Sequence, residues 1–159
     1  MLNNMNNKYY TPKEDEFYSG FEYECCKCLS KSKDKTILDN IFIKYKFEVY
    51  DFLNYGDYYL DRCISDGMVR VKYLDSEDIK SFGFYNEKDV YSTYNKRFVY
   101  KRDERTHYCL GLNDDNYSIF ISIINSSTNK ELAIIFTGKI KNKSELKKIL
   151  TQLFIIKEQ

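Results

Sequence analysis

The strongest constraint on the fold is a series of four strand-like runs in the second half of the chain, separated by short polar connectors. The runs cover residues 97–101, 107–112, 117–124 and 132–140. The connectors "RDER", "NDDN" and "SSTN" contain residues that favour tight turns. Parallel neighbours would need crossover connections of about a dozen residues or more, so these strands must run antiparallel. The sequence therefore predicts an antiparallel meander.

The segment "NKSELKKILTQLF" predicts a helix after the last strand. Asn142 is the expected N-cap, and Glu145 stands three positions later, where a capping residue is common. The apolar stripe at helical spacing consists of Leu146, Ile149, Leu150 and Leu153. We expect this amphipathic helix to lie across the meander.

The first half of the chain mixes both kinds of element. Alternating residues predict strands over 17–25, 41–49 and 68–74. Helices are predicted over 57–65 and 75–83, the second with Asp75 as its N-cap and Gly83 as its stop. The predicted class is α+β, with an antiparallel sheet of roughly five to seven strands. The C-terminal helix and one or two short helices should cover one face.

Length and composition narrow the functional classes. A chain of 159 residues predicts one domain, here 16–159 after an extended N-terminal tail over 1–15. The 25 basic and 24 acidic residues nearly cancel, so no global charge attracts nucleic acid or an anionic membrane. No apolar run reaches the roughly 20 residues that span a bilayer. Five cysteines without a secretion signal favour a cytoplasmic chain with reduced thiols.

A zinc site is one hypothesis for the cysteines. Cys25 and Cys28 form a C-x-x-C pair, and His107 with Cys109 could complete a tetrahedral set. The alternative is that these thiols behave as small buried hydrophobes at strand ends. We favour the alternative, because a chain of this length folds without a structural metal and H-x-C is not a standard zinc motif. No cofactor is therefore expected.

Two further patterns raise the question of catalysis. "GFEYE" places Glu22 and Glu24 on a predicted strand and resembles the first metal-binding strand of carboxylate–amine ligases. The resemblance covers five residues, and acids on the outer face of an amphipathic strand are the simpler interpretation. A nucleophilic pair of His107 with Cys63 or Cys109 has no support from spacing. No phosphate-binding, nucleophile-elbow or metalloprotease motif is present, so an enzyme is not expected.

Tyrosines and basic residues alternate in "YNKRFVYKRDER", as they do in proteins that bind single-stranded nucleic acid. The candidate residues are Tyr94, Lys96, Arg97, Tyr100, Lys101 and Arg102. The basic segment 139–148 could extend such a face. The alternative is a strand that packs its aromatic residues inward, and the near-neutral net charge favours it. A nucleic-acid partner is therefore the less favoured expectation.

Three blocks, "EFYSGFEYE", "VRVKYLDSEDIKSFGF" and "FTGKIKNKSELKKILTQL", resemble a family of small uncharacterised proteins from gut Bacteroides-type bacteria and their phages. The resemblance implies one compact α+β domain and a phage or mobile-element setting. It implies no activity, so no functional residue is carried over. The cysteine cluster lies outside the family pattern.

Together these observations favour a small, non-enzymatic accessory protein that binds another protein. The 16 tyrosines suit a contact surface, since a ring with a hydroxyl tolerates both wet and dry surroundings. An exposed edge strand would also permit homodimerisation by strand pairing.

Overall fold

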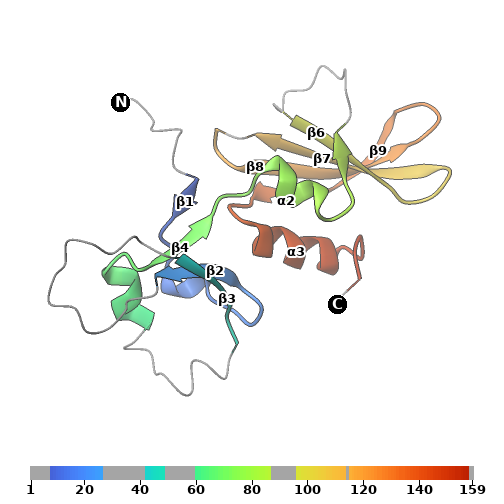
Figure 1. The fold of residues 1–159 in the computed structure, drawn as a ribbon. Helices are drawn as coiled ribbons and strands as arrows, with labels where there is room; N and C mark the ends of the chain where they lie inside the picture. The colour runs from blue at the N-terminus through green and yellow to red at the C-terminus, as the bar shows by residue number, and fades with distance from the viewer. Residues whose placement is uncertain (1–7, 27–41, 49–59, 87–95, 114, 158–159) are drawn as a thin grey trace, which may run out of the picture. The chain divides into compact units, whose positions relative to one another are not determined.

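The computed structural model describes residues 8–26, 42–48, 60–86, 96–113 and 115–157 (Figure 1). The chain divides into two compact units, Met1–Tyr73 and Leu74–Gln159. Each unit has its own antiparallel sheet, of four strands in the first and five in the second. The predicted α+β class is confirmed, although its strands are shared between two sheets. The expectation of one domain over 16–159 stays a prediction.

In unit 1 the strand order is β1-β4-β2-β3. The strands are β1 (Tyr9–Tyr10), β2 (Glu22–Cys26), β3 (Phe42–Lys46) and β4 (Val69–Lys72). The predicted N-terminal tail thus contributes a short strand, β1, and a 3-10 turn, η1 (Glu14–Glu16). Residues 60–65 are helical, within the predicted helix 57–65, whose first residues lie outside the described part.

The predicted strand over 17–25 is wrong at its beginning. Gly20 has a φ of +90°, which breaks an extended chain, and the Phe21 N–H bonds to the Tyr18 carbonyl at 2.9 Å. The strand therefore begins at Glu22, after a turn. That turn places Phe21 in the core of unit 1, together with Phe47 and Val71. The Phe17 ring packs on them, 5.0 Å from Phe21 and 5.4 Å from Phe47 between centroids.

A single guanidinium group joins all four strands of this sheet. Arg70 on β4 donates to the Glu24 carboxylate of β2, with Nε and Nη2 both 2.8 Å from Oε2. Its Cζ lies 3.9 Å from the centroid of the Tyr9 ring and 3.7 Å from that of the Phe42 ring. Tyr9 belongs to β1 and Phe42 to β3. The flat, delocalised cation of arginine can stack on rings and donate to a carboxylate at once, whereas an ammonium group cannot.

We therefore expect Arg70→Lys to lower the free energy of unfolding by about 2 kcal/mol, because it loses the ring contacts and the forked donation. Arg62→Lys is the matched control, since Arg62 makes an exposed ion pair with Asp66 at 3.6 Å. This substitution should change stability by less than about 0.5 kcal/mol. Urea unfolding measures both. Equal effects of the two substitutions would contradict the structural role of Arg70.

Unit 2 confirms the predicted meander. Its sheet has the order β5-β6-β7-β8-β9, so strands that follow one another in sequence pair with one another. The strands are β5 (Tyr85–Asn86), β6 (Lys96–Lys101), β7 (Thr106–Asn113), β8 (Ser118–Asn125) and β9 (Glu131–Lys139). The sequence predicts the last four within one or two residues. It does not predict β5, which is only two residues long.

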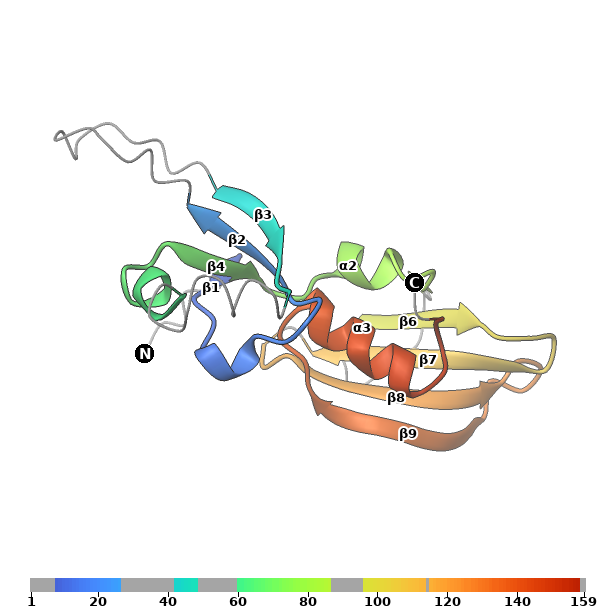
Figure 2. The same cartoon turned by 90° about the horizontal axis from the view of Figure 1, so that it is seen from below.

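Two helices cover one face of this sheet (Figure 2). They are α2 (Ser76–Lys80) and α3 (Lys143–Gln152), and both begin at the predicted caps. The Asp75 carboxylate accepts from two N–H groups of α2, and Asn142 Oδ1 accepts from the Glu145 N–H at 2.9 Å. Their buried residues join those of β6, β7 and β8 in one core. Its fully buried members are Ile79, Phe98, Leu110, Leu112, Ile119, Ile121, Ile140, Leu146 and Leu150.

The opposite face of the three central strands is also buried. Its members alternate with the core residues along the strands, and they are Val99, Cys109, Ser122 and Ile124. The Phe120 ring lies over Gly111 of β7, in the space where any side chain at position 111 would stand. The Arg97 side chain lies over the Cys109 thiol, and its Nε donates to Sγ at 2.9 Å.

The end of α3 has an unusual residue. The Ile155 N–H bonds to the Leu150 carbonyl and the Phe154 N–H bonds to the Thr151 carbonyl, which together form a Schellman motif. In that motif the C′ residue adopts a positive φ and is usually glycine, yet here it is Phe154, at φ 56°. The Phe154 side chain is 91% exposed, whereas Ile155 packs into the core.

Phe154→Gly should therefore raise the free energy of unfolding by about 1 kcal/mol, because glycine adopts this backbone conformation without steric cost. Thermal and urea unfolding of the two proteins measure the change. Gln152→Gly, at an exposed position inside α3, serves as the control and should lower the free energy of unfolding, because glycine is unfavourable within a helix. A loss of stability in Phe154→Gly would mean that the exposed ring has a packing role.

Candidate binding surfaces

The outer edge of the unit 2 sheet is a long, apolar strand. β9 has nine residues and pairs with β8 on one side; the described residues place no strand on its other side. Leu132 and Ile134 are 55% and 56% exposed, and among the described residues the other exposed large hydrophobic side chains are Tyr45, Tyr85 and Phe154. The seven residues 132–138 carry no charge. Such an edge offers both backbone hydrogen-bonding groups and apolar side chains to another chain.

Two bulges shape this edge. Ile121 pairs with Phe136 but the next residue of β8, Ser122, pairs with Ile134, so Ile135 is an extra residue of β9. A second extra residue is Leu132, between the partners of the next two β8 residues. Bulges bend a strand and re-aim its side chains. Ile135 and Phe136 still pack against the core, while Ile134 and Leu132 face solvent.

The other edge strands of the two sheets differ from β9. β5 has only two residues, which limits what could pair with it. In unit 1, β1 is equally short, and β3 carries Lys44 and Lys46 within its five residues. Lysines on an edge strand discourage the approach of a further strand. β9 therefore differs from the other edge strands of the described sheets, because it is long, exposed and uncharged between its two end residues.

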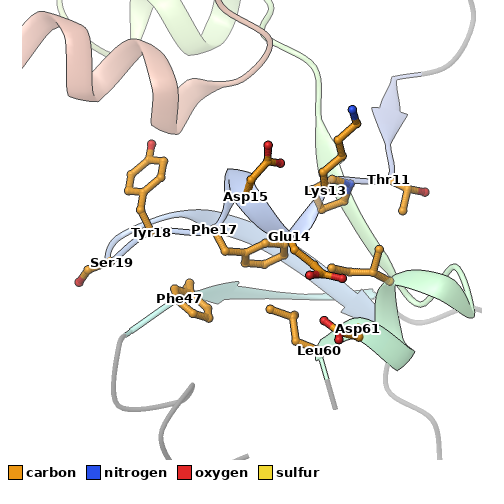
Figure 3. A pocket seen from close by; sticks show the side chains of 12 residues that line it. Thr11, Lys13, Glu14, Asp15, Phe17, Tyr18, Ser19, Phe47, Leu60 and Asp61 are labelled. Carbon is orange, nitrogen blue, oxygen red and sulfur yellow. The ribbon is translucent and has the colours of Figure 1, made fainter. Parts of the chain in front are cut away.

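A separate pocket of about 1150 Å³ lies within unit 1 (Figure 3). Its apolar lining is formed by Phe17, Phe47, Leu60 and Ile64, which come from the turn before β2, the end of β3 and the helix at 60–65. Its charged lining consists of Lys13, Glu14, Asp15 and Asp61. Figure 3 shows Glu14 and Asp61 reaching toward one another, with Leu60 beside them.

The charges of this pocket suit a cation better than an anion. Three acids and one lysine line it, and within the described chain no hydrogen bond or ion pair engages the Asp15 or Asp61 carboxylate. Aromatic faces next to carboxylates also favour a cationic group.

The structure places the four candidate zinc ligands as follows. Cys25 lies on β2 of unit 1, whereas His107 and Cys109 lie on β7 of unit 2. Cys28 lies outside the described residues. Within the described ranges, no group of three or more histidine, cysteine or acidic residues could hold a metal ion. The Cys109 thiol is buried beneath Arg97.

The two acids of "GFEYE", Glu22 and Glu24, lie opposite basic residues of the same sheet. Glu24 is the partner of Arg70 described above. Glu22 is opposite Lys46 in the β2–β3 ladder, and Glu24 is opposite Lys44, so each acid faces a base across the strands. Cross-strand pairs of opposite charge stabilise a sheet. Both acids thus have basic residues opposite them within the sheet.

The basic and aromatic residues of the 94–105 segment divide between different faces. Tyr100 packs against the core, with its ring 5.3 Å from that of Phe84 between centroids. Arg97 lies on the opposite face of β6, over Cys109. Arg102 follows the strand and approaches Asp103 at 3.8 Å. Lys96 and Lys101 stand at the two ends of β6, and Tyr94 lies outside the described residues.

The turn between β6 and β7 is organised by Asp103. Its Oδ1 accepts from the N–H groups of Arg105 and Thr106 at 2.8 and 2.7 Å, and its Oδ2 accepts from the Thr106 hydroxyl at 2.7 Å. The Thr106 hydroxyl, followed by the two N–H groups, lowers the pKa of the Asp103 carboxyl below its ordinary value of 3.8. Sequence analysis recognises this connector as a turn but not the residue that holds it.

A lowered pKa means that the charged carboxylate stabilises the fold at pH values above 3.8, and that this contribution is lost as the pH falls through the lower pKa of the folded state. Asp103→Asn should therefore be less stable than the native chain at neutral pH, with a difference that vanishes in acid. Unfolding measured from pH 7 to pH 2 tests this. Asp115→Asn, also in a turn of this sheet, is the control; a difference for Asp103→Asn that persists in acid would contradict the role of its charge.

Comparisons with family models, with curated proteins and with solved structures find no match to this chain. The described residues also contain no helix that is both long and apolar enough to span a bilayer. The case for each binding surface described above therefore depends on the geometry of this chain alone.

Proposed function

We propose that this chain is a non-enzymatic protein-binding module that acts through the edge of β9. The observation that carries the proposal is the nine-residue edge strand with Leu132 and Ile134 more than half exposed. A partner that adds an extended segment to this edge would satisfy its backbone groups and cover both side chains. Such binding would involve backbone hydrogen bonds and apolar contacts, and it would require no ionisable or nucleophilic side chain.

The energetics of such a contact are favourable. Covering a leucine or isoleucine side chain contributes about 1.5–3 kcal/mol when it is fully removed from water. Here each side chain is already about half buried, so the two together would contribute about 2 kcal/mol before the backbone hydrogen bonds are counted. The absence of charge over 132–138 means that no charged group on the strand must be desolvated.

The setting of this binding is also a proposal. The resemblance of the three sequence blocks supports an accessory role for a phage or mobile element. Reduced cysteines support action in the host cytoplasm, and the four cysteines within the described ranges are free thiols.

Site-specific photocrosslinking in cells that express the chain tests the proposal. A photoreactive phenylalanine analogue replaces Ile134 in one variant and Tyr85 in another. Tyr85 is the control because it is 50% exposed and lies on β5, at the opposite edge of the same sheet. We expect a discrete protein adduct from position 134 and none from position 85.

Adducts of equal yield at both positions, or none at either, would contradict a binding role for β9. An adduct at position 85 alone would move the contact to the other edge of the sheet.

A further inference from the structure

We infer that the occupant of the β9 edge is a second copy of the same strand, paired antiparallel about a two-fold axis. This inference rests on the proposed function, because it names the partner of the same edge. It comes from the distribution of charge along β9. The strand begins with Glu131, ends with Lys139 and is uncharged between them.

Once the two extra residues of β9 are taken into account, an antiparallel pair of identical strands centred on Phe136 brings these ends together. Glu131 of each copy then stands opposite Lys139 of the other, which gives one pair of opposite charges at each end. A shift of the centre by one ladder position would instead place Glu131 opposite Thr137 or beyond the end of the strand. Charge complementarity therefore selects a single register.

The stretch between the ends is uncharged in the same register. Ala133 of one copy stands opposite Gly138 of the other, and Ile134 stands opposite Thr137. The exposed Ile134 side chain therefore meets no charge across the contact. The regular stretch from Phe136 to Lys139 of each copy lies opposite the bulged stretch of the other, because the extra residues of β9 are Leu132 and Ile135.

The geometry of the edges also limits the assembly to two copies. A contact in which the same strand serves on both sides is isologous and closes on itself. The remaining edge of the unit 2 sheet is β5, with two residues, and the longer remaining edge of unit 1 carries two lysines. Neither favours further growth.

Charge reversal tests the register by sedimentation velocity over a range of concentrations. Glu131→Lys alone, or Lys139→Glu alone, puts like charges opposite each other at both ends, and each should weaken the dimer about tenfold. The double variant restores two pairs of opposite charges, and we expect its dissociation constant to return to within about threefold of the native value.

Glu104→Lys is the control for net charge. It changes an exposed turn residue of the same unit and should have no effect on the dissociation constant. Circular dichroism verifies that each variant is folded.

Ile134→Asp should make the chain monomeric at all concentrations, because it places a charge within the contact. A native chain that is monomeric throughout would overturn the second copy as the occupant; a photocrosslink from position 134 to a different protein would then still support the proposed function. A dimer that is insensitive to both Ile134→Asp and the charge reversals would overturn the β9 contact itself.

Discussion

Unit 1 depends on the Arg70 guanidinium. Its sheet has two strands of two and four residues, too short for their ladders alone to hold them in register. The cation links β4 to β2 through Glu24 and to the two outer strands through the Tyr9 and Phe42 rings. Because the pair with Glu24 is partly shielded by those rings, it is less weakened by water than an exposed ion pair. The pocket of unit 1 is built on elements that this sheet holds in place.

The exposure of β9 follows from the widths of the elements in unit 2. Five strands at about 4.8 Å spacing extend about 19 Å from edge to edge, whereas a helix is about 10 Å wide. One long helix, α3, packs on the central strands, and the five-residue α2 adds Ile79 to the same core. Their cover reaches Ile135 and Phe136 of β9 only partly. The rest of the strand stays outside the core, and the Leu132 and Ile134 side chains are exposed.

Short-range features of this fold are predictable from sequence, and long-range ones are not. The caps Asp75 and Asn142 and the turns of the meander depend on residues a few positions apart, so their patterns can be recognised. The Arg70 contact joins residues up to 61 positions apart, and the sequence gives no signal for it. Phe154 stands where glycine is usual, so the sequence does not indicate where α3 ends. For the candidate surface, the last strand of a meander is predictably an edge, but its bulges and outward-facing side chains require the structure.

The contact between Gly111 and Phe120 has a consequence for the descent of this chain. A side chain at position 111 would occupy the space of the Phe120 ring, so neither position can change freely while the other is kept. The two positions face each other across β7 and β8, and they fill one volume between them. In diverging relatives of this protein, a larger residue at the first position should be inherited together with a smaller one at the second. Such a pair would serve as a marker of common ancestry where the rest of the sequence has changed beyond comparison.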